Sequence, residues 1–201
     1  MANAQAIPPS PESDLRARIM IAATRLFADR GYAATSMRDI ADTVSCTKPA
    51  LYYHFGCKAA LFTEVIRTEN ERIIGLLQQT LAAAGSVRER MRLAMHSYFD
   101  YLRQNPVGLR VLFRAELHVE HGQPALDFRS MRQAYIALVT RLLHEGIEAG
   151  EIRPDVAIED AMHVLAGAVD IRAALFIMDG EPIPHDYPER ILALVFGGIA
   201  R

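Results

Sequence analysis

Cysteine is scarce in this 201-residue sequence, and so are segments that would direct a chain into a membrane. Its two cysteines lie eleven positions apart and do not make a disulfide framework. Residues 4–13, AQAIPPSPES, are rich in proline and lack the apolar core of a signal peptide. The longest apolar stretches are too short to span a bilayer or are interrupted, as by Asp170 and Arg172 between residues 161 and 178. We therefore expect a cytoplasmic protein with no membrane segment.

Catalytic motifs are also missing, because there is no glycine-rich nucleotide loop, no nucleophile elbow and no convincing spacing for a triad. The best metal candidate is ELHVEH, residues 116–121, near an expected helix end. Glu116 and Glu120 are four residues apart and share a helix face, but His118 and His121 point elsewhere. A solvated helix end explains this segment better. We expect no enzyme activity, no metal and no cofactor.

A strong charge of either sign is absent, since the net charge is only −2. The charge is unevenly spread: residues 13–60 hold seven Lys or Arg against four acids, which is +3, and the remainder carries −5. A cationic end on an acidic body suits a protein that meets DNA with one end. It does not suit a non-specific DNA-compacting protein, which would need a strong positive charge overall.

The N-terminal quarter contains the signals of a three-helix unit. From residue 13 to 30 one helix face is apolar, and Gly31 suits the end of that helix. Ser36 and Asp39 make a capping box for a second helix, which has room for about two turns. The residues expected to face inward across the unit are Ile19, Ala22, Ala23, Leu26, Phe27, Ile40, Ala41, Val44, Leu51 and Phe55.

The second helix gives way to a tight turn at residues 45–46, after which Thr47 can cap a third helix. Pro49 lies in the first turn of that helix, where its missing N–H is tolerated. Two short helices around a turn indicate a helix-turn-helix, although an ordinary pair of core helices is the alternative. The outward side chains favour DNA, because the only two lysines of the chain, Lys48 and Lys58, flank a Tyr-Tyr-His run.

Residues 31–61 carry a specific pattern of small, polar and aromatic positions. Its members are Gly31, Tyr32, Thr35, Ser36, Arg38, Asp39, Ile40, Ala41, Lys48, Pro49, Leu51, Tyr52, Tyr53, His54, Phe55, Lys58 and Leu61. This pattern resembles the signature of the TetR family of bacterial transcriptional regulators. The sequence departs from it at Ser45, where the family usually has glycine, and at Cys46 and Cys57. Serine can enter the turn, but a left-handed conformation costs it more than glycine.

By this resemblance, the third helix is the recognition helix and enters the major groove of DNA with its first residues. Its tyrosines, its histidine and Lys58 resemble the phosphate-contacting residues of the family. Two of the positions have structural alternatives, because Thr35 can serve as a cap and Tyr53 can pack inside. The implied DNA contacts are Thr35, Ser36, Arg38, Thr47, Lys48, Pro49, Ala50, Tyr52, Tyr53, His54 and Lys58.

The remaining two thirds of the chain read as an all-α body, giving about nine helices in total. We expect a disordered tail at 1–12, a DNA-binding domain at 13–57, and an effector-binding and dimerisation domain at 58–201. The expected body helices cover about 58–84, 86–105, 107–120, 124–149, 156–178 and 188–200.

The last helix is apolar nearly all round at residues 191–196, and the helix at 156–178 is rich in small residues. An apolar surface of this length suggests a partner, although a buried core helix is the alternative. The resemblance implies that these two helices form a four-helix interface across a two-fold axis. A homodimer of this kind binds a pseudo-palindromic operator.

The resemblance also implies a small-molecule effector between the central helices, although apolar stripes are more often plain core. The expected pocket residues are Phe62, Met91, Met95, Phe99, Phe113, Met131, Tyr135, Met162, His163 and Phe176. The function predicted is a dimeric repressor that an effector releases from double-stranded DNA. The alternatives are an activator that responds to a ligand or to oxidation of Cys46 and Cys57, and a small-molecule binder whose DNA reader is vestigial.

Overall fold

A computed structural model describes residues 11–199, and over that range the chain consists of nine helices and their connections. The helices are α1 (Pro11–Arg30), α2 (Met37–Val44), α3 (Lys48–Phe55), α4 (Lys58–Leu81), α5 (Val87–Gln104), α6 (Pro106–Leu117), α7 (Phe128–Glu148), α8 (Ile158–Asp179) and α9 (Tyr187–Ile199). The all-α prediction is therefore confirmed.

The observed starts of α1 and α7 differ from those expected. The first helix, α1, begins at Pro11, so residues 11 and 12 are helical, while the rest of the expected tail lies outside the described residues. Proline is well tolerated in a first helical turn. The second case is α7, which begins at Phe128 rather than near residue 124, because the Asp127 side chain caps it by accepting a hydrogen bond from the Ser130 N–H at 2.9 Å.

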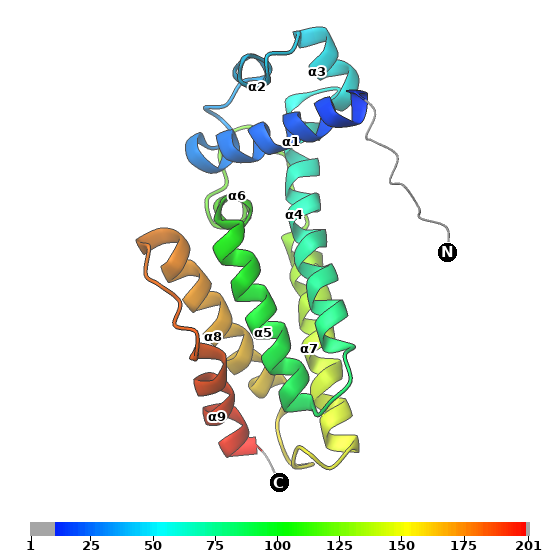
Figure 1. Ribbon diagram of the computed structural model, residues 1–201, viewed down its shortest axis with the longest axis vertical. Coiled ribbons are helices and arrows are strands. Elements are labelled where there is room, and N and C mark those ends of the chain that lie inside the picture. The colour runs from blue at the N-terminus through cyan, green and yellow to red at the C-terminus, as the bar shows by residue number, and fades with distance from the viewer. Residues whose placement is uncertain (1–10, 200–201) are drawn as a thin grey trace, which may run out of the picture.

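The first three helices form a head at one end of an elongated molecule (Figure 1). Helix α1 packs against α2, and the first half of α4 and one side of α6 close the core from below. The largest fully buried side chains of this head core include Phe27, Ile40 and Leu51. The head thus rests on α4 and α6, which both continue into the body.

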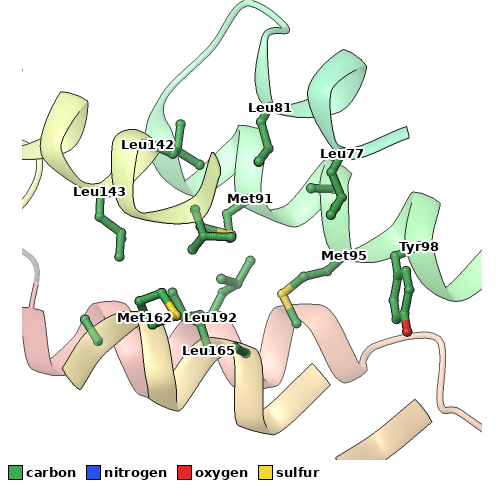
Figure 2. Close-up of a cluster of buried hydrophobic side chains, with 14 of the residues drawn as sticks. Leu77, Leu81, Met91, Met95, Tyr98, Leu142, Leu143, Met162, Leu165 and Leu192 are labelled. Carbon is green, nitrogen blue, oxygen red and sulfur yellow. The ribbon is translucent and has the colours of Figure 1, made fainter. Parts of the chain in front are cut away.

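The body is a bundle of long helices that alternate in direction (Figure 1). Helix α4 leaves the head, α5 returns, α7 leaves again and α8 returns, while the short α6 lies beneath α1. Side chains from α4, α5, α7, α8 and α9 converge on a second core at the far end (Figure 2). This core includes Leu81, Met91, Leu142, Met162 and Leu192.

Helix α8 is long and apolar enough to cross a bilayer by length and composition, with a mean hydropathy of 1.6 in its most apolar window. It nevertheless packs against α6, α7 and α9 as a member of the bundle, and it carries Asp170 and Arg172. Only 28% of that window is buried within one subunit. The apolar composition of α8 is therefore better explained by protein contacts than by lipid.

Candidate nucleic-acid interface and internal cavity

The α2–turn–α3 unit is built from local signals that the sequence already displays. The Ser36 Oγ accepts a hydrogen bond from the Asp39 N–H at 3.1 Å, and the Ser36 N–H donates to the Asp39 carboxylate at 2.9 Å. Hydrogen bonds from the side chain and backbone of Ser36 hold the pKa of Asp39 below its usual value. Thr47 caps α3 by accepting a hydrogen bond from the Ala50 N–H. Both predicted caps are therefore present.

The turn between these helices adopts a conformation that usually favours glycine. Ser45 has φ 55° and ψ 46°, and it is the only described residue other than glycine with a positive φ. Its N–H and that of Cys46 donate to carbonyls of the last turn of α2, which ends the helix there. Serine thus supports the left-handed turn that the family usually builds with glycine, at the cost expected for a residue with a Cβ.

The outward face of α2 and α3 is polar, aromatic and cationic, while the apolar residues expected inside are buried. Tyr53 is 79% exposed, which excludes the alternative that it packs in the core. Lys48 is exposed at the first position of α3, and Arg38 forms only a solvent-exposed ion pair with Asp42 at 3.6 Å. The predicted contact residues that are exposed are Ser36, Arg38, Thr47, Lys48, Pro49, Tyr52 and Tyr53, and Ala50 and His54 are partly exposed.

Two residues predicted to contact phosphate, Thr35 and Lys58, form hydrogen bonds within the head. Thr35 is 1% exposed, and its hydroxyl donates to the Gly31 carbonyl at 2.7 Å, at the end of α1. The Lys58 ammonium donates to the carbonyls of Tyr32 and Thr35 at 2.9 and 3.0 Å and lies 4.1 Å from the centre of the Tyr32 ring. Burial removes the Thr35 side chain from contact with phosphate. Lys58 is partly exposed and meets these carbonyls because α4 begins beside the 31–35 loop, so its contact with phosphate stays a prediction.

An internal cavity of about 410 Å³ opens between the helices of the body. Its volume lies in the range typical of small-molecule sites. Most of its wall is apolar, with contributions from α4, α5, α6, α7 and α8. Five of the predicted pocket residues line it: Met91, Met95, Phe113, Met131 and Tyr135.

The other five predicted pocket residues lie elsewhere. Phe62 belongs to the head core, with its ring 5.0 Å from that of Phe27. Phe99 and Met162 are buried in the body core away from the cavity, His163 is exposed, and Phe176 is half-buried beyond the lining. Helical periodicity identifies the inward face of a helix, but it does not show which part of that face adjoins a void.

Sequence reasoning missed the contribution of α4 to the cavity. The lining residues of this helix are Asn70, Ile73, Ile74, Leu77 and Leu81. Their spacing follows the i, i+3, i+4, i+7 pattern of one helix face, so the signal was available in the sequence. The pattern did not distinguish a cavity wall from a packed interface, because both are apolar.

The polar groups of the cavity wall include two tyrosines and one unpaired acid. Burial, followed by the nearby Asp170 charge, raises the pKa of both Tyr98 and Tyr135. Burial and then the charge of Glu116 raise the pKa of Asp170, while Arg132 opposes this shift. Asp170 therefore lies close enough to Tyr98 and Tyr135 to affect the ionisation of both. Glu116 itself forms an ion pair with Arg132 across the wall.

A polar joint connects the end of α6 to the head. The Glu120 carboxylate accepts hydrogen bonds from the Ala33 N–H at 2.8 Å and from Arg114 at 2.9 Å, and Arg110 pairs with Asp29 at 3.1 Å. At Gly31, φ is 88° and a Cβ would collide with the Glu120 carboxylate. Glycine is needed there for its conformation and for its lack of a side chain. Glu116 and Glu120 are thus committed to ion pairs rather than to a metal.

The outer side of α8 and α9 exposes large apolar side chains. Val164 and Ile171 are each 58% exposed, Met178 is 72% exposed, and Leu194 is 75% exposed. Single exposed apolar residues are common, but these four lie on two neighbouring helices. The alternative that α9 is a fully buried core helix does not hold for this side of it.

The two cysteines flank α3 and have structural roles. The Cys57 thiol caps α4 by accepting a hydrogen bond from the Ala60 N–H, with 3.4 Å between sulfur and nitrogen. Cys46 is partly buried, and burial raises the pKa of its thiol, which makes the reactive thiolate scarcer. Partial burial favours a packing role for Cys46, whereas Cys57 is exposed and caps α4.

The chain is similar to known regulators over nearly its whole length. A sequence profile described as bacterial regulatory proteins of the tetR family matches residues 19–65, and one described as the C-terminal domain of tetracyclin repressor-like proteins matches residues 81–195. The HTH-type transcriptional activator FasR of Mycolicibacterium smegmatis is 29% identical over 193 residues, covering 94% of this chain and 85% of FasR. The HTH-type transcriptional repressor KstR2 of the same organism is 27% identical, covering 96% of this chain and 94% of KstR2.

Solved structures share the fold. The crystal structure of FadR from Bacillus subtilis in complex with stearoyl-CoA matches with a TM-score of 0.73 at 19% identity. The match covers 91% of this chain and 98% of the FadR chain. Head and body are therefore arranged in this chain as in that regulator.

Proposed function

The chain belongs to the TetR family of bacterial regulatory proteins, and we propose that it is a homodimeric repressor released from a pseudo-palindromic operator by a small-molecule effector. Members of this family are DNA-binding transcription regulators rather than enzymes. One observation carries the proposal. The exposed polar face of α2 and α3 is joined through α4 and α6 to a cavity of small-molecule size.

The reader of DNA is α3, whose first residues enter the major groove. Lys48 donates to guanine acceptors, and Pro49 and Ala50 contact thymine methyl groups. Tyr52 and Tyr53 donate to backbone phosphates on either side, since both are exposed. The N-terminus of α2 adds phosphate contacts through its free N–H groups. This division assigns specificity to the start of α3 and affinity to the flanking groups.

Two subunits associate through the outer faces of α8 and α9. The exposed apolar side chains on these helices give a continuous surface that one subunit leaves uncovered. A two-fold axis through this surface places both heads on one side of the dimer, and each α3 then meets one half-site. The protein acts in the cytoplasm, where bacterial DNA is accessible.

The effector acts by favouring one arrangement of the body. Helices α4 and α6 both contribute to the cavity wall and both contact α1, so a ligand that changes their positions also changes the position of the head. A coupling free energy of about 1–3 kcal/mol changes operator affinity by roughly 5–150-fold. Because the FadR relative was crystallised with stearoyl-CoA, long-chain acyl thioesters are the first effectors to test.

Activation is the second candidate for the sign of regulation. It is favoured by the FasR relative, which is a transcriptional activator, whereas KstR2 is a repressor. Both outcomes use the same reader and the same cavity. They differ in where the operator lies relative to the promoter.

The test begins with selection of bound sequences from random duplexes by the full-length protein. A palindromic consensus supports the proposal; indiscriminate binding or no binding opposes it. With the selected duplex, Tyr52→Ala weakens binding by roughly tenfold or more at an unchanged melting temperature. A matched control is Arg141→Ala, which removes a cation from α7 far from the head and leaves affinity within about twofold. Unchanged affinity in Tyr52→Ala contradicts the assignment of the reader.

A further inference from the structure

The polar lining residues contributed by α4, α5 and α8 lie at the end of the cavity nearer the head, where α6 and the start of α7 also contribute apolar side chains. Helix α4 leaves the head while α5 and α8 return to it, so early residues of α4 and late residues of α5 and α8 are the nearer ones (Figure 1). In each of these helices the lining residue nearer the head is polar and a lining residue farther away is apolar. The pairs are Asn70 and Leu81, Tyr98 and Met91, and Asp170 and Leu165.

Three polar groups at the near end have no partner in the protein. Among the hydrogen bonds formed by the described residues, none involves the hydroxyl of Tyr98, the hydroxyl of Tyr135 or the carboxylate of Asp170. Tyr98 is only 9% exposed, and Figure 2 shows its ring beside the apolar cluster. None of these polar atoms is both fully buried and without a partner, so each is accessible to water or to a ligand that can complete its hydrogen bonds. The site is therefore equipped to make hydrogen bonds that the protein does not itself complete.

The charge of this end is negative. Arg132 is the only cation in the lining, and its ion pair with Glu116 neutralises both. Asp170 remains as an unpaired carboxylate at the open side of the cavity, where it is also exposed to solvent. Burial, followed by the charge of Glu116, raises the pKa of Asp170.

We propose that this polar end recognises a hydrogen-bond donor, a hydroxyl or amino group, carried on an apolar skeleton, and that it discriminates against a free carboxylate. The inference rests on the proposed function, because it specifies the effector of the same cavity. Asp170 accepts the donor of the ligand, and the hydroxyls of Tyr98 and Tyr135 donate to its oxygen or lie beside its nitrogen. The apolar skeleton extends toward Met91 and Leu81 and displaces poorly held water from that end.

This orientation places the polar end group of the ligand next to α6. Glu116 lies in the last turn of α6, and four residues later Glu120 accepts the hydrogen bond from the Ala33 backbone in the head. A ligand that engages Asp170 changes the electrostatic surroundings of the Glu116–Arg132 pair, which joins the end of α6 to α7. The polar end of the effector is therefore positioned to act on the joint that holds the head.

The experiment compares ligands that differ only in their end group. Isothermal titration of the full-length protein with 1-decanol, decylamine and decanoate, each below its aggregation threshold, measures the preference directly. Decanol and decylamine bind at least roughly tenfold more tightly than decanoate, because a second carboxylate near Asp170 is repelled. Comparison of decanol with decylamine shows whether the neutral or the cationic donor is preferred. Decanoyl-CoA and stearoyl-CoA complete the set of ligands.

Variants identify the groups responsible. Asp170→Asn brings the affinity for decanoate to within about threefold of that for decanol, because the repelling charge is gone. Tyr135→Phe weakens decanol by roughly three- to tenfold through the loss of one hydrogen bond. Asp179→Asn, which removes an exposed carboxylate at the end of the same helix, leaves every affinity unchanged. Melting temperatures and operator binding report whether each variant is folded.

Each outcome decides the inference. Decanoate binding as tightly as decanol to the unaltered protein overturns it, as does an Asp170→Asn variant with an unchanged preference. Binding of an acyl-CoA together with no binding of decanol or decylamine overturns the inference alone and leaves the proposed function standing. If no compound of the set binds while operator binding is intact, the effector part of the proposed function fails as well.

Discussion

The head and the body of this protein bury alanines equally well but surround them differently. Ala41 in α2 is 1% exposed and belongs to the head core, whereas Ala94 in α5 is 3% exposed and adjoins the cavity. The head core is closed by α1, α2, α3, α4 and α6, and its exposed polar groups point outward. The body leaves a void into which its polar groups point. A close-packed head and a body with a cavity are thus built from the same kind of helix.

The burial of a residue alone does not distinguish the close-packed head from the body with its cavity. A residue that is fully buried can face either close-packed neighbours or an empty space, and these differ in what substitution they tolerate. The head needs fixed geometry, since base contacts depend on the position of α3. If an effector acts as proposed, the body needs two arrangements of similar free energy between which a ligand can shift it.

The strongest test places the same larger side chain in both regions. Ala41→Leu destabilises the protein by about 2–3 kcal/mol, because the head core has no room for three more carbon atoms. Ala94→Leu is neutral or stabilises by about 0.5–2 kcal/mol, because its side chain fills the cavity. Urea denaturation of both variants measures the contrast. Equal destabilisation by the two substitutions would remove the distinction between a solid head and a hollow body.

Substitution of the two lysines by alanine separates the proposed DNA contact of Lys48 from the stabilisation of the head by Lys58. Lys58→Ala lowers the free energy of unfolding by about 1.5–3 kcal/mol, because two carbonyls lose a charged donor. Lys48→Ala leaves stability within about 0.5 kcal/mol, because the side chain is exposed, and it weakens operator binding by roughly tenfold or more. Denaturation and fluorescence anisotropy separate the two effects. Unchanged stability in Lys58→Ala would mean that the hydrogen bonds of Lys58 to the head do not stabilise the fold.

The joint between the regions predicts a dependence of stability on pH. Burial raises the pKa of Glu120, but the hydrogen bonds from Ala33 and Arg114 outweigh it, so the folded-state pKa is lowered. The unfolded state therefore takes up the proton first, and the stabilisation is present above the ordinary glutamate pKa of roughly 4.3 and is lost as the pH falls through the folded-state value.

Glu120→Gln removes this charge and costs about 1–2 kcal/mol at pH 7. The difference from the unaltered protein shrinks as the solution is acidified, which denaturation at several pH values can follow. Glu148→Gln, at the exposed end of α7, serves as the control and leaves the pH profile unchanged. A constant difference at all pH values would mean that Glu120 acts by packing rather than by charge.

The smallest expected effect concerns the turn of the reader. Ser45→Gly stabilises the protein by about 0.5–1 kcal/mol, because glycine adopts the left-handed conformation without strain. The gain is small because glycine also loses more conformational freedom on folding than serine does. Operator affinity stays the same, since the turn geometry is already formed. A loss of stability would indicate that the Ser45 side chain makes a favourable contact that outweighs the strain.

The head shows how far sequence reasoning can go and where it stops. The Ser36 and Thr47 caps were predicted correctly because capping depends on residues three positions apart. The hydrogen bonds of Lys58 within the head could not be predicted in this way. Its partners are the carbonyls of Tyr32 and Thr35, more than twenty positions earlier, and no local pattern indicates that they lie beside the start of α4.

The body shows the same limit on a larger scale. The prediction that α4–α8 are helices with apolar inner faces followed from periodicity. Half of the expected pocket residues do not line the cavity, because its position depends on how five helices fail to fill the space between them. Phe62 illustrates this: it is on the inner face of α4, but at the level of the head.

The sequence by itself determined the helices, their caps and the outward chemistry of the reader, because these depend on side chains within a few residues of one another. Only the tertiary structure decided that Lys58 and Thr35 form hydrogen bonds within the head and that Glu120 joins α6 to the head. It also decided that Tyr98, Tyr135 and Asp170 line one cavity. The physical reason is that an unfilled space and a long-range hydrogen bond are properties of several packed segments at once, and no single segment encodes them.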